Sequence, residues 1–476
     1  MTDLLAELHT VVGADHVLTG DGLAAWEQDW RRRQRGRALA VVRPGSTAEV
    51  AAVVRACAQA RQRDPLSGPS LVPQGGNTGL VVGGVPDASG RQVVLSLQRM
   101  NRLRALDADN LTLTAEAGCV LSVLQQQAQA AGFLFPLSLA AEGSCTIGGN
   151  LATNAGGTQV LRYGNARELC LGVEVVTAQG DIWNGLTGLR KDNTGYDLRH
   201  LMIGSEGTLG IITAATLKLY PLPVARLTAW VAVPSVGQAL ALLRLAHRHL
   251  GPGLTGFELM GQLALDLVAR HLPGQRVPLP GSGPWAVLLE NSDHESADHA
   301  RARFDRLLEE ALETGCASDA VLAHTLAQAE AMWQVRESIP LAQAQEGLNI
   351  KHDIAVPISA IPDFVAAAET RLQAAVPGVR IVNFGHLGDG NLHFNVQAPE
   401  HTDPAAFLRD HEAMVNELVF DTVQAFGGSF SAEHGIGGLK VGHLARYKPA
   451  PALAMMRAIK QALDPLGLLN PGRVLA

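Results

Sequence analysis

The sequence lacks several patterns that would assign it to a specialised class. It has five cysteines and no Cys-x-x-Cys pair, which argues against a disulfide framework and indicates reduced thiols. No apolar run is long enough to cross a bilayer, and the first residues carry no basic cluster like that of a signal peptide. The formal charge of −7 and the lack of a basic helix argue against nucleic acid as a partner. We therefore expect a globular cytoplasmic protein, with peripheral attachment to the inner face of a membrane left open.

Two common nucleotide-binding signatures are also missing. An expected strand at 70–72 runs directly into the glycine-rich segment 73–79. This segment matches neither the Gly-x-Gly-x-x-Gly of a Rossmann site nor the Gly-Lys-Ser/Thr end of a P-loop. It can still present several backbone N–H groups to an anion, although a plain tight turn explains it equally well. A nicotinamide site is therefore disfavoured, and an anion site stays open.

Glycine is abundant, with 50 residues, many of them between Gly75 and Gly210. Two further small-residue segments, 136–158 and 204–210, follow 73–79 in the same half of the chain. We expect 136–158 to be a long, ordered loop that lines a buried space. Three such segments on strand-rich scaffolding favour a large phosphate-bearing cofactor over coincidence.

The second half alternates strands with helices, beyond a Pro-Leu-Pro boundary that ends at Pro223. The pattern predicts an antiparallel sheet with helices on one face. With 476 residues, of which 47% are hydrophobic and 17% charged, the chain is long enough for two domains. A helix at 326–339 carries Arg336, and a strand at 349–356 carries Lys351. Both cations suit a solvated surface, and as a pair they would also bind carboxylates.

Two histidines flank a Gly-Asp-Gly turn between expected strands at 379–384 and 391–396. A tight turn would bring His386 and His393 near one point, and Asp389 would stabilise that turn. A lone histidine in a strand is usually structural, so it is the pairing that favours a metal.

About forty residues later, Glu433 and His434 stand side by side in another glycine-flanked segment. Two histidines and one glutamate suit a divalent ion with an open coordination position, and zinc, manganese or iron would fit. The second residue of the pair, His434, could then act as an acid or base.

Together these segments resemble FAD-linked 2-hydroxy-acid dehydrogenases of the vanillyl-alcohol-oxidase-type flavoprotein superfamily. The similarity runs from about Arg35 to the C-terminus and keeps the order of the motifs. Residues 335–339 and 349–354 look closest to D-2-hydroxyglutarate dehydrogenases, with D-lactate dehydrogenases next. The resemblance implies an α+β fold with a two-subdomain FAD-binding domain at 1–223. It also implies a cap domain at 224–435, with an antiparallel sheet covered by helices, and a segment at 436–476 that returns to the FAD domain.

The cofactor implied by the resemblance is FAD, bound without a covalent link. Relatives that attach the flavin carry a histidine in the first loop, where this chain has Asn77. The residues implied to contact FAD are Pro73, Gln74, Gly75, Gly76, Asn77, Thr78, Gly79, Ser138, Gly143, Ser144, Gly148, Asn150, Gly207, Ile212 and Asn470.

A divalent metal, zinc in first place and manganese or iron as alternatives, is implied on a second set of residues. Its ligands would be His386, His393 and Glu433. In this reading His434 takes the proton from the substrate hydroxyl while a hydride passes to FAD. The residues implied to hold substrate carboxylates are Arg336, Lys351 and Asn395.

The implied substrate is a small D-2-hydroxy acid, and D-2-hydroxyglutarate is favoured. Pro340 stands where close relatives often have a hydroxyl residue, which leaves D-lactate, D-malate or glycolate open. The expected electron acceptor is a quinone, a cytochrome or an electron-transfer flavoprotein, and a homodimer is left open. Two other functions also stay open: an O₂-using oxidase of the same fold, and a non-catalytic regulator that binds metal and nucleotide.

Overall fold

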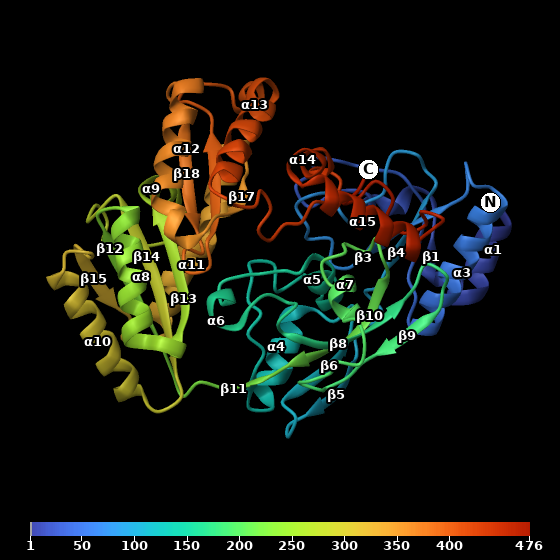
Figure 1. Cartoon of the computed structure of the whole chain (residues 1–476), viewed down its shortest axis with the longest axis horizontal. Coiled ribbons are helices and arrows are strands. Elements are labelled where there is room, and N and C mark those ends of the chain that lie inside the picture. Colours follow the sequence, from blue (N-terminus) through green and yellow to red (C-terminus); the bar gives the residue numbers. More distant parts are fainter. Residues whose placement is uncertain (1) are drawn as a thin grey trace. The chain divides into compact units, whose positions relative to one another are not determined.

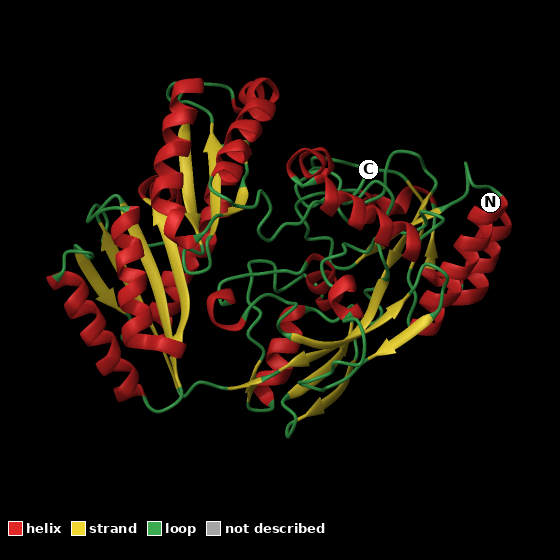
Figure 2. Ribbon diagram, viewed as in Figure 1, coloured by secondary structure: helices red, strands yellow, loops and turns green. Residues whose placement is uncertain are grey.

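The computed structural model describes residues 2–476, and the chain divides into two compact units. Unit 1 comprises Met1–Gly156, Gly164–Pro221 and Glu433–Ala476, and unit 2 comprises Gly157–Tyr163 and Leu222–Ala432. The C-terminal segment thus contributes to the first unit. Figure 1 traces the elements along the chain, and Figure 2 separates helices from strands. No helix of the described residues is long and apolar enough to span a membrane.

Unit 1 opens with a four-stranded sheet in the order β1-β2-β4-β3, in which β2, β4 and β3 run parallel. Strand β2, helix α3 and strand β3 form a parallel β-α-β unit, and α1 and α3 cover the sheet with an aliphatic core. The elements of this part are α1 (Thr2–Val12), β1 (Val17–Leu18), α2 (Ala24–Glu27), β2 (Ala38–Val42), α3 (Thr47–Arg63), β3 (Ser70–Gln74) and β4 (Gln92–Ser96).

A five-stranded antiparallel sheet follows in unit 1, in the order β5-β6-β10-β8-β9, beside a small β7–β11 pair. Its elements are β5 (Leu103–Asp107), β6 (Thr112–Glu116), α4 (Leu121–Ala130), β7 (Phe133–Leu134), α5 (Ile147–Thr153), β8 (Cys170–Val176), β9 (Ile182–Gly185), α7 (Leu198–Met202), β10 (Ile211–Lys218) and β11 (Tyr220–Pro221). The helices α14 (Val441–Tyr447) and α15 (Ala450–Leu463) complete the unit.

The segment 136–158 is not entirely a loop, because α5 lies within it. Sequence reading misses this helix since it contains two consecutive glycines, which are poor helix formers. Packing overrides that propensity here. Ile147 and Leu151 are fully buried, and a Cβ at Gly148 would lie 2.6 Å from the Cβ of Ala117, so only glycine permits this approach.

Unit 2 is built on an eight-stranded antiparallel sheet in the order β15-β12-β14-β13-β18-β19-β16, with β17 also paired to β19. Its strands are β12 (Ala225–Val233), β13 (Leu254–Gly261), β14 (Trp285–Asp293), β15 (Asp319–Leu322), β16 (Asn349–Ile350), β17 (Asp353–Ala355), β18 (Arg380–Gly385) and β19 (Asn391–Gln397). Its helices are α6 (Val160–Tyr163), α8 (Val236–Leu250), α9 (Gln262–His271), α10 (Ala297–Glu313), α11 (Leu326–Glu346), α12 (Ile361–Ala375) and α13 (Pro404–Ala425).

Helices cover both faces of this sheet, so the prediction of one covered face was wrong. Trp230, Met260 and Leu288 point toward α9 and α11 and share one core with them. The helices α8 and α10 pack together and also contact β12 and β14, but contribute no residue to that core. Strand β13 is buried at every position, as expected for a strand that is covered on both faces.

Two elements near the predicted carboxylate-binding residues also differ from the sequence prediction. Helix α11 does not stop at Ile339 but continues through Pro340 to Glu346. The predicted strand 349–356 is divided into β16 and β17, with Lys351 in the interruption.

Candidate active site

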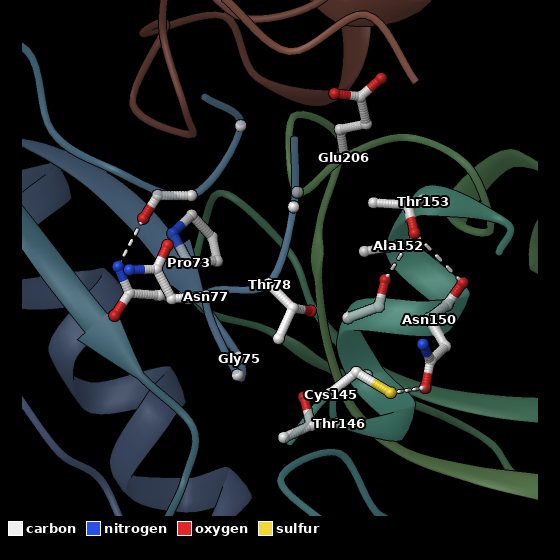
Figure 3. Close-up of a pocket in the computed structure, with 18 of the residues that line it drawn as sticks. Pro73, Gly75, Asn77, Thr78, Cys145, Thr146, Asn150, Ala152, Thr153 and Glu206 are labelled. Atoms are coloured by element: carbon white, nitrogen blue, oxygen red, sulfur yellow. Dashed lines mark hydrogen bonds between the residues drawn. The ribbon is translucent and has the colours of Figure 1, made fainter. Parts of the chain in front are cut away.

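A pocket in unit 1 is lined by the three glycine-rich segments (Figure 3). It has about 1080 Å³ of empty space, a volume that includes open solvent. The predicted residues that line it are Pro73, Gln74, Gly75, Gly76, Asn77, Thr78, Gly79, Gly148, Asn150, Gly207, Ile212 and His434. The predicted residues outside the lining are Ser138, Gly143, Ser144 and Asn470.

Other lining residues have no counterpart in the sequence prediction, among them Val81–Val85, Thr146, Thr153, Ser205 and Glu206. Four of these residues lie inside the segments 136–158 and 204–210, and residues 81–85 lie just beyond 73–79, so nearness to the glycines was the only available signal. The predicted contact Asn470 lies behind the wall. Its side-chain amide donates to the carbonyls of Gly83 (3.0 Å) and Glu206 (2.9 Å), and so ties two lining segments together.

Glycines allow two lining segments to meet. A Cβ at Gly75 would lie 2.3 Å from Thr146 Oγ1, and a Cβ at Gly76 would lie 2.1 Å from the carbonyl oxygen of Ser144. Real Cβ atoms essentially never come within 3.0 Å of such neighbours. The close approach of the segments 73–79 and 144–146 therefore requires glycine at these two positions.

The side chains of the first loop hold the loop itself. Gln74 Nε2 donates to the carbonyls of Trp26 (3.0 Å) and Gly84 (2.7 Å). Asn77, at a φ of +54°, donates from Nδ2 to the carbonyl of Gln28 (2.9 Å). These bonds fix the loop shape and leave its backbone to face a ligand.

The donors of the pocket fit a phosphate-bearing cofactor. Across residues 2–476, none of the backbone N–H groups of 75–79 donates to a protein acceptor. Thr146 Oγ1 is likewise buried and without a protein partner in the described chain. A run of unpaired N–H groups and an unpaired hydroxyl is the donor set that a pyrophosphate or a flavin carbonyl would satisfy.

His434 borders the same pocket, and a carboxylate organises the backbone that follows it. Glu206, at a φ of +53°, accepts from the N–H groups of Ile436 (2.8 Å) and Gly437 (2.7 Å). Loss of water around Glu206 raises the pKa of its carboxyl, and the two backbone hydrogen bonds act in the opposite direction. The segment after His434 is thereby held to the loop that follows α7.

Unit 2 brings the two hairpin histidines together. The ring centroids of His386 and His393 are 5.5 Å apart, with an angle of 78° between the planes. The turn is closed by the Gly390 N–H, which donates to the His386 carbonyl (3.2 Å), and Gly390 has a φ of +91°. Asp389 Oδ1 accepts from the Asn391 N–H (3.1 Å), as predicted for a turn-stabilising aspartate. Burial raises the pKa of Asp389 to about 6.

A carboxylate that sequence reading missed connects two of the predicted residues. Glu258 on β13 is fully buried; its Oε1 is 2.7 Å from His386 Nδ1 and its Oε2 accepts from Arg336 Nε (2.7 Å). Burial by itself would raise the pKa of Glu258, but the charges and hydrogen bonds of His386 and Arg336 outweigh it and hold the pKa at about 2. The available signal was a charged residue inside an apolar strand.

The remaining predicted residues lie on the same sheet. Asn395 is two positions from His393 on β19, and therefore on the same face. Its Oδ1 accepts from the His352 N–H (3.1 Å), and its Nδ2 donates to Gln343 Oε1 (2.9 Å). Lys351 is half-buried between β16 and β17. Asn395 is thus already engaged on both sides, which fixes its orientation.

The imidazoles of unit 2 fit a metal. His386 has a carboxylate on its Nδ1, and Asp353 Oδ1 lies 4.0 Å from the Nδ1 of His393. Metal-binding histidines commonly have a carboxylate hydrogen-bonded to the nitrogen that does not coordinate, and the 2.7 Å contact of His386 with Glu258 has this form. In unit 1, Glu433 lies against Gly156, where a Cβ would be 2.7 Å from Glu433 Oε1.

Comparisons with known proteins match the chain to two families of FAD-related domains. The chain matches the FAD binding domain family over residues 38–185 and the family of FAD linked oxidases, C-terminal domain, over residues 222–474. It is 41% identical to a D-2-hydroxyglutarate dehydrogenase of Xanthomonas citri pv. viticola, over 95% of this chain and 92% of that protein. It is 38% identical to the mitochondrial D-2-hydroxyglutarate dehydrogenase of Bos taurus, over 99% and 83%.

The fold is also that of a solved structure, p-cresol methylhydroxylase with substrate bound. The TM-score is 0.75 at 17% identity, over 99% of this chain and 96% of the other. This likeness confirms the predicted α+β fold of the vanillyl-alcohol-oxidase type. The matches to the two family domains and to the relatives cover nearly the whole chain. The protein therefore belongs to the family of FAD-linked oxidases.

Proposed function

We propose that the protein is a FAD- and metal-dependent dehydrogenase that oxidises a D-2-hydroxy acid, D-2-hydroxyglutarate in first place, to the 2-oxo acid. The observation that carries the proposal is the Glu258 contact. It joins a guanidinium, which suits a substrate carboxylate, to one of two paired imidazoles, which suit a metal. The names of the relatives in Xanthomonas and Bos taurus support the substrate class.

FAD would lie in the unit 1 pocket, with its phosphates on the unpaired N–H groups of residues 75–79 and a polar group on Thr146. When bound, it accepts two electrons as a hydride from the substrate carbon. Asn77 uses its side chain within the protein, at the carbonyl of Gln28, which supports non-covalent binding.

A divalent ion, zinc in first place and manganese or iron as alternatives, would be held by His386, His393 and Glu433. When bound, it lowers the pKa of a coordinated hydroxyl. Glu433 is proposed as the third ligand because it directly follows Ala432, whose N–H donates to the Asp353 carbonyl (3.3 Å). Asp353 in turn is paired with His393 across β17 and β19. The chain thus leaves unit 2 close to the second histidine.

The protein's own groups would hold the substrate and move its proton. Arg336 presents Nη1, because Glu258 occupies its Nε and Nη2 and, within residues 2–476, no protein acceptor is bonded to Nη1. Lys351 would add a point charge and Asn395 an oriented amide at the carboxylates. The ring of His434, which borders the FAD pocket, would take the hydroxyl proton. Holding both substrate ends fixes the C–H bond for hydride transfer.

Anaerobic flavin bleaching by a panel of D- and L-2-hydroxy acids tests the proposal. The purified holoprotein should be yellow, should bleach with a D-2-hydroxy acid and should stop turning over after chelation while it keeps FAD. His434→Gln should keep FAD but bleach far more slowly, whereas the exposed control His9→Gln should behave as wild type. A protein that no 2-hydroxy acid bleaches would refute the function, and normal bleaching of His434→Gln would remove that residue from the mechanism.

A second substrate, D-lactate, is favoured by one observation on α11. Pro340 lies four residues after Arg336 on a continuous helix, and so on the same face as the guanidinium. A proline ring there offers no hydroxyl to a distal carboxylate. The ratio of kcat/KM for D-lactate, D-malate and D-2-hydroxyglutarate in the same panel decides between them.

Peroxide release in air, compared with turnover on a quinone or an artificial dye, separates an oxidase from a dehydrogenase.

A further inference from the structure

Glu258 divides its two carboxylate oxygens between two different functional groups. Oε1 is paired with His386 Nδ1 at 2.7 Å. Oε2 accepts a hydrogen bond from Nε of Arg336 at 2.7 Å and forms an ion pair with its Nη2, also at 2.7 Å. The side chain of Glu258 is 0% exposed, and those of His386 and Arg336 are each 7% exposed. Water therefore has little access to replace either contact.

Each contact fixes an orientation. A proton on Nδ1 that points at Glu258 assigns Nε2 of His386 as the coordinating nitrogen, because a ring nitrogen cannot both carry a proton and bind a metal. The fork at Oε2 fixes the guanidinium plane, and the Phe384 ring lies below it with the guanidinium carbon 5.0 Å from its centroid. Arg336 is thus left with Nη1 as its outward edge.

We infer that Glu258 is a positioning residue that holds the metal ligand His386 and the substrate-binding Arg336 in one fixed geometry, an inference that rests on the proposed function. The carboxylate touches neither substrate nor metal itself. Glu258 couples His386 to Arg336, because any movement of β13 displaces both side chains together. The metal end and the carboxylate end of the substrate are therefore set at a constant separation.

A neighbouring glutamate provides a matched control. Glu290 on β14 lies on the same face as Glu258, is 4% exposed and accepts from Thr255 Oγ1 (3.0 Å) and Trp333 Nε1 (3.2 Å). The two glutamates thus share residue type, burial and sheet face. They differ in their partners, because those of Glu290 belong to neither functional group.

Glu258→Gln tests the shared role with two separate measurements on the FAD-loaded chain. The amide has one acceptor oxygen, so it cannot accept from both partners, and its NH₂ opposes an N–H or a guanidinium. Zn²⁺ affinity, measured without substrate by competition with a chromogenic chelator, should fall roughly 10- to 100-fold. The KM for the best hydroxy acid should rise as well, while FAD content stays at the wild-type level.

Three variants make the result specific. Glu290→Gln should leave both Zn²⁺ affinity and KM at wild-type values, even where its melting temperature falls. Arg336→Lys should raise KM and leave Zn²⁺ affinity unchanged, and Glu258→Asp should give smaller changes than Glu258→Gln in both measurements. The aspartate variant also keeps the test valid if the glutamine variant fails to fold, because it retains the buried negative charge.

The outcomes separate this inference from the function beneath it. A wild-type protein that binds no Zn²⁺ and is bleached by no hydroxy acid refutes the proposed function and the inference with it. Wild-type behaviour of Glu258→Gln in either measurement, with wild type and Glu290→Gln both active, overturns the shared role alone.

Discussion

Replacement of Gly76 by alanine should weaken FAD binding by a predictable amount. The new Cβ would lie 2.1 Å from the carbonyl oxygen of Ser144 and 3.0 Å from the Cα of Cys145. Both neighbours are backbone atoms, so no side-chain rotation can relieve the contact. The segments 73–79 and 144–146 must separate by roughly 1 Å to reach an ordinary contact distance.

The size of the effect follows from the cost of overpacking. A forced shift of this kind costs about 1–3 kcal/mol in well-packed proteins. The strain falls on the segments that carry the unpaired N–H groups and Thr146 Oγ1. If it is expressed in the pocket, the Kd for FAD should rise by roughly 5- to 150-fold, at about 1.4 kcal/mol for each factor of ten.

The assay is titration of the apoprotein with FAD, followed by flavin fluorescence, together with thermal melts of the apo form. Gly442→Ala in α14 is the matched control, since a Cβ there meets nothing within 4 Å. That variant should bind FAD as wild type and should be equally or more stable, because alanine favours a helix over glycine. The reasoning is refuted if Gly76→Ala has both the FAD affinity and the melting temperature of wild type.

Three further predictions concern side chains at other positions. Glu206→Gln should slow flavin reduction in FAD-saturated protein roughly tenfold, because an amide cannot accept from the backbone N–H groups of both Ile436 and Gly437. An unchanged rate of flavin reduction in stopped-flow measurements contradicts this prediction. Burial opposes ionisation of Glu346, but hydrogen bonds from Arg380 and His271 and the nearby charges hold its pKa at about 2. A carboxyl with a lowered pKa stabilises the fold at pH values above its unfolded pKa of about 4.3. The melting temperature of wild type should therefore fall as the pH is lowered from there to about 2. The melting temperature of Glu346→Gln should fall less over the same range. All five cysteines are buried, and burial raises the pKa of Cys57 and Cys170 to about 12. A thiol reagent should therefore label none of them in the native holoprotein and all five after denaturation. Rapid labelling of one cysteine in the native protein would contradict its burial.

The features that local sequence predicts are those whose cause is local. The Gly-Asp-Gly turn brings His386 and His393 together because adjacent strands must pair across a tight turn. The β-α-β opening follows from helical spacing and from the Ser46 cap, whose hydroxyl accepts from the Glu49 N–H at 3.2 Å. The second layer of helices on the unit 2 sheet has no such local cause, because it depends on contacts of α8 and α10 with strands distant in the sequence.

The same distinction applies to the candidate site. The glycine-rich segments predict the unit 1 pocket, but the glycines do not indicate which atoms face a ligand. Gln74 and Asn77 are predicted FAD contacts that line the pocket, and their side chains also hold the loop to the carbonyls of Trp26, Gly84 and Gln28. Which polar groups are left for a cofactor depends on these bonds, and they form only between segments distant in the sequence.

Two of the residues that sequence reading missed, Glu258 and Glu206, each have a carboxylate shared between two donors. Glu258 is 128 residues from His386 and 78 from Arg336, and Glu206 is 230 residues from Ile436. No spacing rule connects such positions. A carboxylate is suited to binding two donors because both of its oxygens accept hydrogen bonds and it carries no N–H or O–H group when ionised. An amide has only one oxygen and presents N–H groups on its other side. Buried glutamates with two functional partners should therefore tolerate glutamine far less well than their shape suggests. The contrast between Glu258 and Glu290, alike in burial and different only in partners, measures how much of that intolerance belongs to function and how much to the fold.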